Sequence, residues 1–409
     1  MFNLKKQSLL VIFILLISNV ALTKEWKISP SKNAQDELQT ALILAEPGDR
    51  IILASGSFNL MHGLSLDVDN VILEGAGMDK TFLIFDEQKT GAQGLLVTSD
   101  NVTLQNFAVI NAKGDAIKSK GADKISFLNL KTEWTNGPDS LNGAYGLYPV
   151  ESTRVLIDGC VAIGASDAGI YVGQSEQIIV RNSRAEYNVA GIEIENSYYA
   201  DVYDNVTTNN TGGILVFDLP NLPKQGGKFV RVFRNKSFAN NTDNFAPEGN
   251  IVGEVPRGTG VIIMANRNVE VFDNDIFNHE TINVAIVAGD LESGDDSYDP
   301  YPKKVQIHSN RIFNSGYNPD LTRGDLGPIL GDVAKGDMPD ILWDGVLPIS
   351  QVLFGQNKQE KMILQNNGRA KFLDLDAVRY VALPFFHSPS RNISEFQGAV
   401  TPLPEVAEW

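Results

Sequence analysis

Short runs in which Val, Ile and Phe alternate with polar residues recur along most of the chain, and each run ends at Asn, Gly or Asp. Alternation with a period of two is typical of β-strands, and these separators tolerate the left-handed backbone of turns. The run AGIYV at 168–172 returns as AGIEI at 190–194, which places Ile170 and Ile192 22 residues apart. The pattern therefore predicts a repeating array of strands.

A polar marker follows a β-rich stretch in successive repeats. It is Asn106, Asn129, Gly159, Asn182, Asn205, Asn235, Asn274 and Asn310, with intervals of 23, 30, 23 and 23 residues up to 205. Units of this length are shorter than a βαβ unit, which needs about 30 residues or more. Parallel strands must then be joined by coils of the same chain, which predicts an all-β parallel β-helix of about eight to ten coils. Coils stacked about 4.8 Å apart would place Asn over Asn in a hydrogen-bonded ladder.

The chain after residue 23 divides into three predicted regions. Residues 24–65 form an N-terminal cap and first coil, because Leu38, Ala41, Leu42 and Ala45 have the spacing of an amphipathic helix. Residues 66–317 form the β-helix, and 318–409 form a wrapping segment followed by strands that close the far end. A small independent domain at the C-terminus is the alternative.

Residues 1–23 have the features of a secretory signal peptide. Lys5 and Lys6 precede the apolar run 9–17, and small or polar residues follow. The run is shorter than the roughly 20 residues that span a bilayer, and no later stretch is long and apolar enough. A retained N-terminal anchor is the alternative. We expect a periplasmic or secreted monomer.

Composition narrows the classes of partner. The formal net charge is −16, and no basic stripe typical of a nucleic-acid binder is visible. The single cysteine, Cys160, cannot form an internal disulfide. Its neighbours in VLIDGCVAIGA indicate strand and turn, which favours a small buried residue over a reactive thiol.

Four longer strings connect the chain to known proteins. SDAGIYVGQS, VAGIEIENS, TGGILVFDLP and NTDNFAPEGN resemble a family of exported bacterial parallel β-helix proteins of uncharacterised function, over about residue 48 to the C-terminus. The resemblance implies a right-handed, pectin-lyase-like β-helix, and a dihaem c-type cytochrome as a periplasmic partner. Family members have two Cys in the closing segment, whereas Met362 stands at one of these places, so no disulfide is expected there. The family supplies no catalytic residues.

The wider superfamily contains polysaccharide lyases, polygalacturonases, alginate epimerases and tailspike modules. The chain has no Gly-His-Gly or Arg-Ile-Lys motif of polygalacturonases and no Asp-Pro-His motif of alginate epimerases; DPYP at 299–302 lacks the His. These absences argue against those particular activities and leave carbohydrate binding open.

Aligning the coils on their apolar positions defines a surface row. With Ile117, Leu147, Ile170, Ile192, Ile214 and Val261 inside the stack, the next residue of each coil points outward. The outer row is then Lys118, Tyr148, Tyr171, Glu193, Leu215 and Ile262. Two positions further lie Lys120, Val150, Gly173, Glu195, Phe217 and Met264. Glycines one position before the row would let a ligand approach the backbone closely.

This row combines aromatic, acidic and basic side chains, as sugar binding requires, although a solvated outer face is the alternative. Glu193 and Glu195, about 6.6 Å apart at Cα, could act as the two carboxylates of a glycoside hydrolase. Asp167 and Asp218 are further candidates for binding the substrate.

A polysaccharide lyase would instead need a cation against the uronate carboxylate, for which Lys118 or Lys120 is the candidate. Tyr148 or Tyr171 would then be the base.

Other features supply weaker candidates. The acidic loop with Asp290, Glu292, Asp295 and Asp296 offers oxygen ligands for Ca²⁺, but it lacks EF-hand spacing, which favours a solvated charge run. No other cofactor is indicated. Three insertions, 218–227, 241–258 and 290–303, would wall a groove if they leave one side of the stack.

Two functions remain open. The first is a carbohydrate-active protein that binds a polysaccharide over the outer row, and the second is a non-catalytic scaffold that docks a periplasmic partner. An open cleft favours the first; a covered row with an exposed apolar patch at Leu215, Phe217 and Met264 favours the second.

Overall fold

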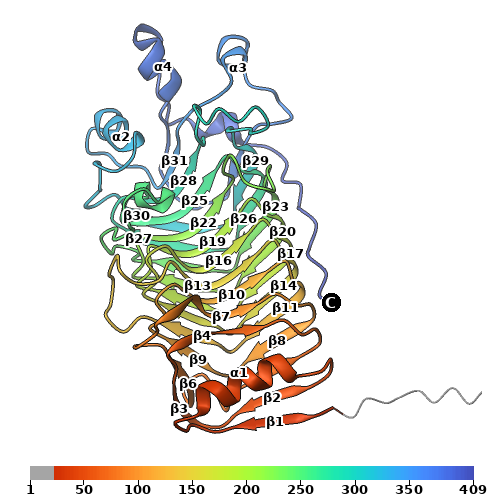
Figure 1. The fold of residues 1–409 in the computed structure, drawn as a ribbon. Coiled ribbons are helices and arrows are strands. Elements are labelled where there is room, and N and C mark those ends of the chain that lie inside the picture. The colour runs from red at the N-terminus through yellow and green to blue at the C-terminus, as the bar shows by residue number, and fades with distance from the viewer. Residues whose placement is uncertain (1–22) are drawn as a thin grey trace, which may run out of the picture.

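The computed structural model describes residues 23–409 as a right-handed parallel β-helix built from three sheets (Figure 1). The predicted fold class is confirmed. The predicted signal peptide lies, except for its last residue, outside the described residues. Among residues 23–409, no helix is both long and apolar enough to cross a membrane.

Each coil contributes one strand to each sheet in the order A, B, C. Sheet A contains twelve strands: β1 (Glu25–Ile28), β2 (Arg50–Leu53), β5 (Ile72–Glu74), β8 (Val102–Gln105), β11 (Asp123–Leu128), β14 (Thr153–Asp158), β17 (Glu176–Arg181), β20 (Tyr198–Tyr203), β23 (Lys228–Phe233), β26 (Arg267–Phe272), β29 (Lys303–His308) and β32 (Ile363–Gln365).

Sheet B contains ten strands: β3 (Gly56–Asn59), β6 (Thr81–Ile84), β9 (Ala108–Ile110), β12 (Lys131–Glu133), β15 (Val161–Ile163), β18 (Arg184–Glu186), β21 (Val206–Thr208), β24 (Lys236–Phe238), β27 (Asp275–His279) and β30 (Arg311–Ser315). Sheet C contains eleven: β4 (His62–Leu66), β7 (Thr90–Val97), β10 (Asp115–Lys120), β13 (Tyr145–Val150), β16 (Ala168–Gly173), β19 (Ala190–Glu195), β22 (Gly212–Phe217), β25 (Thr259–Met264), β28 (Ile282–Val287), β31 (Ile341–Trp343) and β33 (Phe372–Asp374). Every sheet-B strand is followed by a sheet-C strand, so the described chain forms ten coils.

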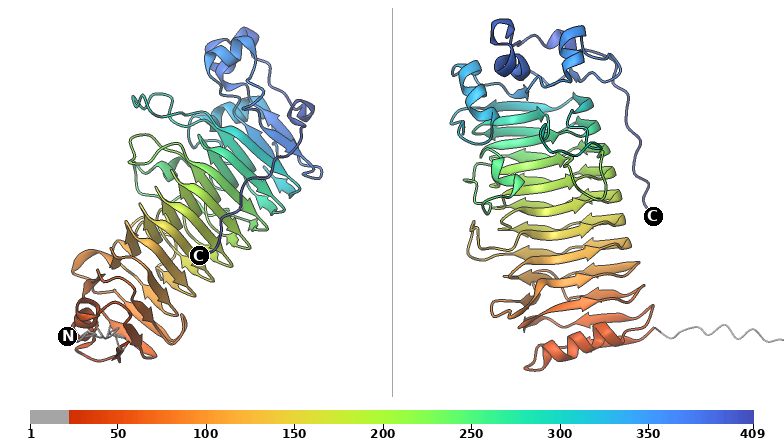
Figure 2. Two further views of the ribbon diagram at one scale, coloured as in Figure 1. Left: turned by 90° about the vertical axis from the view of Figure 1, so that its right-hand side faces the viewer. Right: turned by 45° about the horizontal axis from the view of Figure 1, so that its top comes forward.

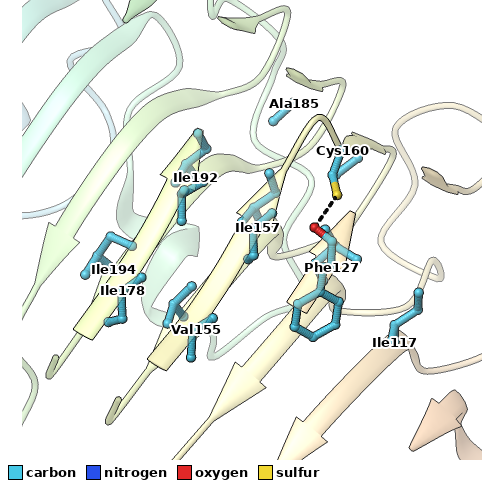
Figure 3. Close-up of a cluster of buried hydrophobic side chains, with 14 of the residues drawn as sticks. Ile117, Phe127, Val155, Ile157, Cys160, Ile178, Ala185, Ile192 and Ile194 are labelled. Carbon is cyan, nitrogen blue, oxygen red and sulfur yellow. Dashed lines mark hydrogen bonds between the residues drawn. The ribbon is translucent and has the colours of Figure 1, made fainter. Parts of the chain in front are cut away.

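The core is the inside of the coil. Ile117, Ile170 and Ile192 are fully buried and stack in parallel register, as the alignment of the coils predicts. Figure 3 shows such side chains pointing inward from successive coils, with Cys160 among them. Cys160 Sγ donates to Phe127 O at 3.4 Å. The prediction of a buried, structural cysteine is therefore confirmed.

An asparagine ladder runs along the turn between sheets A and B. The Nδ2 of each residue donates to the Oδ1 of the next at 2.9–3.0 Å, through Asn205, Asn235, Asn274, Asn310 and Asn367. Ser183 occupies the ladder position in the preceding coil, since Ser183 N donates to Asn205 Oδ1 at 2.9 Å.

In the N-terminal half, the sequence analysis assigned the ladder position to the residue just before the one that occupies it. Asn106, Asn129, Asn182 and Gly159 have φ between +50° and +68°, so they are the left-handed residue before the ladder position. Asn is favoured in both places, which is why the two positions have the same sequence marker.

A second ladder that the sequence analysis missed lies between sheets B and C. Asn188 Nδ2 donates to Asn210 Oδ1, and Asn210 Nδ2 donates to Asn240 Oδ1, both at 2.9 Å. His279 continues the column, with Nε2 3.1 Å from Asn240 Nδ2 and Nδ1 2.7 Å from Asn283 Oδ1. Burial lowers the pKa of His279 to about 4, so the ring is neutral and structural.

Both ends of the stack are covered. Helix α1 (Ala34–Leu44) buries Leu38, Ala41 and Leu42 over the first coil, which confirms the predicted N-terminal helix (Figure 1).

At the far end β31, β32 and β33 extend sheets C and A, but part of the segment predicted as strands is helical. Helices α3 (Ile349–Phe354) and α4 (Ala377–Ala382) lie where strands were predicted, whereas α2 (Leu326–Ala334) lies in the predicted wrapping segment. The 3₁₀ turns η2 (Pro384–Phe386) and η3 (Ile393–Phe396) follow the predicted strands. Short apolar runs do not distinguish a strand from a helical turn, which explains the difference.

The insertions flank sheet C on both edges. Segments 218–227 and 290–303 leave the corner between sheets C and A, and 241–258, with the 3₁₀ turn η1 (Ile251–Glu254), leaves the corner between sheets B and C. These loops stand out from the side of the stack (Figure 2). The expected walls around one face are therefore present.

Candidate functional site

The outer row has the predicted register on sheet C. Lys118 pairs with Tyr148, Tyr171 pairs with Glu193, and Glu193 pairs with Leu215 in neighbouring parallel strands. Because side chains alternate along a strand, residues next to buried Ile170 and Ile192 face outward. The prediction of one shared face is confirmed for these residues.

The N-terminal end of the row is partly open and contains a cation on an aromatic face. Lys118 Nζ lies 4.2 Å from the ring centroid of Tyr148 and 3.8 Å from Asp115 Oδ2. The Lys118 side chain is 21% exposed, so solvent or a ligand can reach it. Tyr145, Tyr148 and Tyr171 form a compact group with centroids 4.4–4.9 Å apart.

A carboxyl cluster follows in the next coils, made of Asp167, Glu193 and Glu195. All three are at most 8% exposed. Glu195 Oε1 accepts from Tyr171 Oη at 2.5 Å and from Gln174 Nε2 at 3.0 Å. Burial raises the pKa of Glu195 above its usual value, and these two donors offset part of that rise.

Glu193 is buried as well. Burial, together with the neighbouring charges of Glu195 and Asp167, raises the pKa of Glu193 well above its usual value. It shares a hydrogen bond with Glu195, and its Oε2 is buried without any hydrogen-bond partner among the described residues. Because burial raises the pKa of both Glu193 and Glu195, the two carboxyls titrate as a coupled pair that favours holding a proton.

Asp167 completes the cluster. Its Oδ2 accepts from Tyr145 Oη at 3.3 Å and from Asn250 Nδ2 at 3.2 Å. Burial and the charge of Glu195 raise the pKa of Asp167 to about 7. The protonation of this site therefore changes near neutral pH.

The insertion 241–258, which we call the cover loop, lies over the C-terminal part of the row. Val252 and Val255 pack in one apolar cluster with Tyr171 and Leu215. Arg323 anchors the loop by donating to Gly253 O at 3.1 Å. This C-terminal part of the row is thus neither an open cleft nor an exposed apolar patch, since Leu215 and Phe217 are buried.

The glycine strip faces inward, contrary to expectation. A Cβ added to Gly169 would lie 2.6 Å from Asn188 Nδ2, and one added to Gly213 would lie 2.4 Å from Gly260 O. Ala168 and Ala190 instead pack in one apolar cluster with Tyr171. These glycines make room for the second ladder rather than for a ligand.

The geometry bears on both candidate mechanisms. Glu193 and Glu195 are in hydrogen-bond contact, whereas hydrolysis needs carboxyls about 5–9.5 Å apart on the two sides of a sugar bond. Burial raises the pKa of Tyr148 and of Tyr171, which makes both phenols poor bases as they stand. Proton donation by Glu193 and substrate binding remain compatible with the site.

The other predicted residues lie at its margins. Lys120 forms an ion pair with Glu151 at 3.4 Å, and both side chains are exposed. Asp218 accepts from the backbone N–H groups of Gly226 and Gly227 at 3.0 and 2.8 Å, so it stabilises the 218–227 insertion.

The acidic loop is explained by contacts within the protein. Asp295 Oδ2 accepts from Asn221 N at 2.8 Å and from Gln225 Nε2 at 2.5 Å, which joins two insertions. Within residues 23–409, no group of three or more His, Cys, Asp or Glu is arranged to hold a metal ion. The structure provides no support for Ca²⁺ in this loop.

Sequence analysis missed Asp115, Tyr145, Gln174 and Asn250. Asp115 and Tyr145 begin β10 and β13, outside the two aligned positions of each coil. Asn250 reaches the site from the cover loop, 83 residues from Asp167. Only Gln174 carried a signal, since it lies two residues after the repeated AGIYV segment and three after Tyr171.

Comparison with known proteins agrees with the fold. A family model described as "Right handed beta helix region" matches residues 83–223. No curated protein sequence matches the chain. The A-module of the mannuronan C-5 epimerase AlgE6 from Azotobacter vinelandii superimposes with a TM-score of 0.56 and 16% identity, covering 83% of this chain and 81% of that one.

An alginate lyase from Paenibacillus sp. superimposes with a TM-score of 0.50 and 16% identity, covering 72% of this chain and 99% of that one. At this identity the likeness shows the fold alone. The chain contains a right-handed β-helix region, and its structural neighbours include carbohydrate-active β-helix enzymes.

Proposed function

We propose that the protein is an exported carbohydrate-active β-helix protein that binds a polysaccharide on the outer face of sheet C. The observation that carries the proposal is the carboxyl cluster between two sets of insertions. Glu193 is buried there with an unpartnered oxygen, which the packing of a scaffold does not require and normally avoids.

The two ends of the face have different roles in this proposal. Lys118, on the ring of Tyr148, is the accessible end and would bind an acid group of the chain. The carboxyl cluster would accept hydroxyl groups when the cover loop moves away, and Glu193 would be the proton donor if a bond is broken. The name of each neighbouring enzyme describes a reaction on a polysaccharide, which supports the class of ligand and not a particular activity.

The experiment compares the mature protein with its Glu193→Gln variant on a panel of polysaccharides that includes polyuronates. Binding is followed by calorimetry and cleavage by the appearance of new chain ends. Glu37→Gln, at an exposed position of helix α1, is the matched control, because α1 contacts β4, five strands of sheet C away from β19 and the carboxyl cluster. We expect the Glu193 variant to lose at least about tenfold in affinity. Absence of binding across the panel would contradict the proposal.

The second candidate, a periplasmic docking scaffold, is favoured by a different surface. Large apolar side chains are exposed on the C-terminal cap, with Phe354 at 88% and Phe385 at 98%. Exposed aromatic side chains of this size are typical of interaction surfaces. If no polysaccharide binds, association with a purified dihaem c-type cytochrome, lost in a Phe354→Asp variant, would support this candidate instead.

A further inference from the structure

The last residues of the chain, 399–409, form an extended tail along the outer face of sheet A. Figure 2 shows the tail leaving the cap and running back beside the strands toward the N-terminal end. Thr401 exchanges two hydrogen bonds with the Gln306 side chain on β29, both 2.8 Å. Leu403 N donates to Glu270 Oε2 on β26 at 2.8 Å, and Val406 N donates to Asp201 Oδ2 on β20 at 3.1 Å.

The acidic side chains of the tail meet arginines. Glu405 lies 3.5 Å from Arg231 on β23, and Glu408 pairs with Arg181 on β17. The tail therefore presents both kinds of group that an acidic polymer would present. Its N–H donors meet carboxylates, and its carboxylates meet guanidinium groups.

The spacing of these contacts matches the repeat of the sheet. Pro402 and Pro404 favour a polyproline II conformation, which rises about 3.1 Å per residue. The three residue steps from Leu403 to Val406 then cover about 9.3 Å. Strands β26 and β20 are two strand spacings apart, which is about 9.6 Å, so the two lengths agree. A pyranose unit has about the length of one strand spacing, about 4.8 Å, so a sugar chain along this path would meet one coil per sugar.

The residues of sheet A under the tail are polar, whereas buried contacts between packed elements are normally apolar. Asp201, Arg231, Glu270 and Gln306 pair in successive strands and form one column, which we call the sheet-A column. Each is at most 6% exposed. Asp201 Oδ1 and Arg231 Nε lie 3.2 Å apart as a buried ion pair, so the column places charged groups of both signs under the tail.

A cleft of about 420 Å³ opens where the tail meets the cap. Lys304, Lys358 and Lys361 line this lysine cleft together with Gln306 and Thr401. Within residues 23–409, none of these lysines belongs to an ion pair of 4.0 Å or less, although the whole chain has a net charge of −16. Glu395 also lines the cleft, so three lysines against one glutamate leave a net formal charge of +2 in this concave site, which attracts an anionic ligand.

We propose that the lysine cleft and the sheet-A column form a second binding site, for an acidic polysaccharide, which the tail occupies in the absence of that ligand. Acid groups of the polymer bind the cleft lysines, Arg231 and Arg181, while its hydroxyls donate to Asp201 and Glu270. This site lies on a different sheet from the one proposed above and does not depend on it.

The test measures hydrogen exchange of the tail amides by mass spectrometry in the full-length mature protein. Polygalacturonate and alginate are the probes, with a neutral glucan and polyglutamate as comparisons. We expect both polyuronates to accelerate exchange in the tail peptide that contains Leu403 and Val406, because the ligand displaces it. The Lys358→Gln, Lys361→Gln double variant is expected to weaken polyuronate binding at least about tenfold. Lys32→Gln at an exposed position is the matched control.

Each other outcome overturns the proposal. Unchanged tail exchange at saturating polyuronate would show that the ligand does not use sheet A. Equal displacement by polyglutamate would assign the site to an acidic peptide. Loss of the exchange change in Glu193→Gln would place the binding on sheet C, whereas retention separates the two sites.

Discussion

The buried Asp167 makes stability depend on pH in a direction that can be calculated. Its pKa is about 7 in the folded chain, against about 3.9 in an unfolded chain. For a carboxyl whose folded pKa is raised, the associated stability is present below the unfolded pKa and is lost as the pH rises through the folded pKa. At about 1.4 kcal/mol per tenfold change, ionising Asp167 above pH 7 costs the fold about 4 kcal/mol.

Replacing Asp167 by Asn should remove this cost. An amide oxygen can still accept from Tyr145 and Asn250, so the hydrogen bonds at Oδ2 are kept. About 2 kcal/mol of the cost falls between pH 5.5 and pH 7. The lower pH is set at 5.5 because an acidic protein loses its net charge, and with it solubility, at more acidic pH. We therefore expect the stability of Asp167→Asn relative to the parent to be about 2 kcal/mol higher at pH 8.0 than at pH 5.5.

The measurement is equilibrium urea unfolding, followed by tryptophan fluorescence, of the parent and the variant at both pH values. Asp36→Asn on exposed helix α1 is the matched control and should show no pH-dependent difference. An equal effect of Asp167→Asn at the two pH values would refute the pKa argument. Destabilisation at pH 8.0 would show that the cluster needs the charge of Asp167.

Two further predictions test the ladder and the core. Asn235→Ala should lower the free energy of unfolding by at least about 2 kcal/mol, because buried partners in the ladder lose their hydrogen bonds. Asn182→Gly should change the free energy of unfolding by less than about 0.5 kcal/mol, since Asn182 is an exposed residue with φ +50°. Equal losses of stability in the Asn235 and Asn182 variants would contradict the assigned ladder register. Burial raises the pKa of Cys160 to about 12, so iodoacetamide at pH 8 should alkylate the unfolded protein and leave the native one unmodified. Alkylation of the native protein would show that this part of the stack opens.

The fold was predictable because the repeat determines the register. Ile170 and Ile192 pair across β16 and β19, and the residues after them face outward, as the sequence alignment of the coils requires. The ladder was less predictable because Asn is favoured both at the left-handed residue and at the ladder position one residue later. Asn182 and Asn205 have the same sequence context but different roles.

The environment of the site was not predictable from local pattern. Strand alternation indicates that Glu193 points away from the core, but not that it is buried. Nor does it indicate that the cover loop packs on Tyr171 and Leu215 through Val252 and Val255, about 60 residues further along the chain. The position of the tail was not predictable either, because nothing in the sequence of 399–409 predicts contacts with Asp201 or Arg181.

The residue at the ladder position, in the turn between sheets A and B, is apolar in the first coils and asparagine in the later ones. The position held by asparagines from Asn205 onward is held by Phe107, Leu130 and Cys160 in earlier coils. Apolar burial weakens on cooling, whereas hydrogen bonds do not share this temperature dependence. The two halves of one continuous rod therefore respond differently to cold, and the first coils to loosen in a chilled solution should be those near the N-terminus.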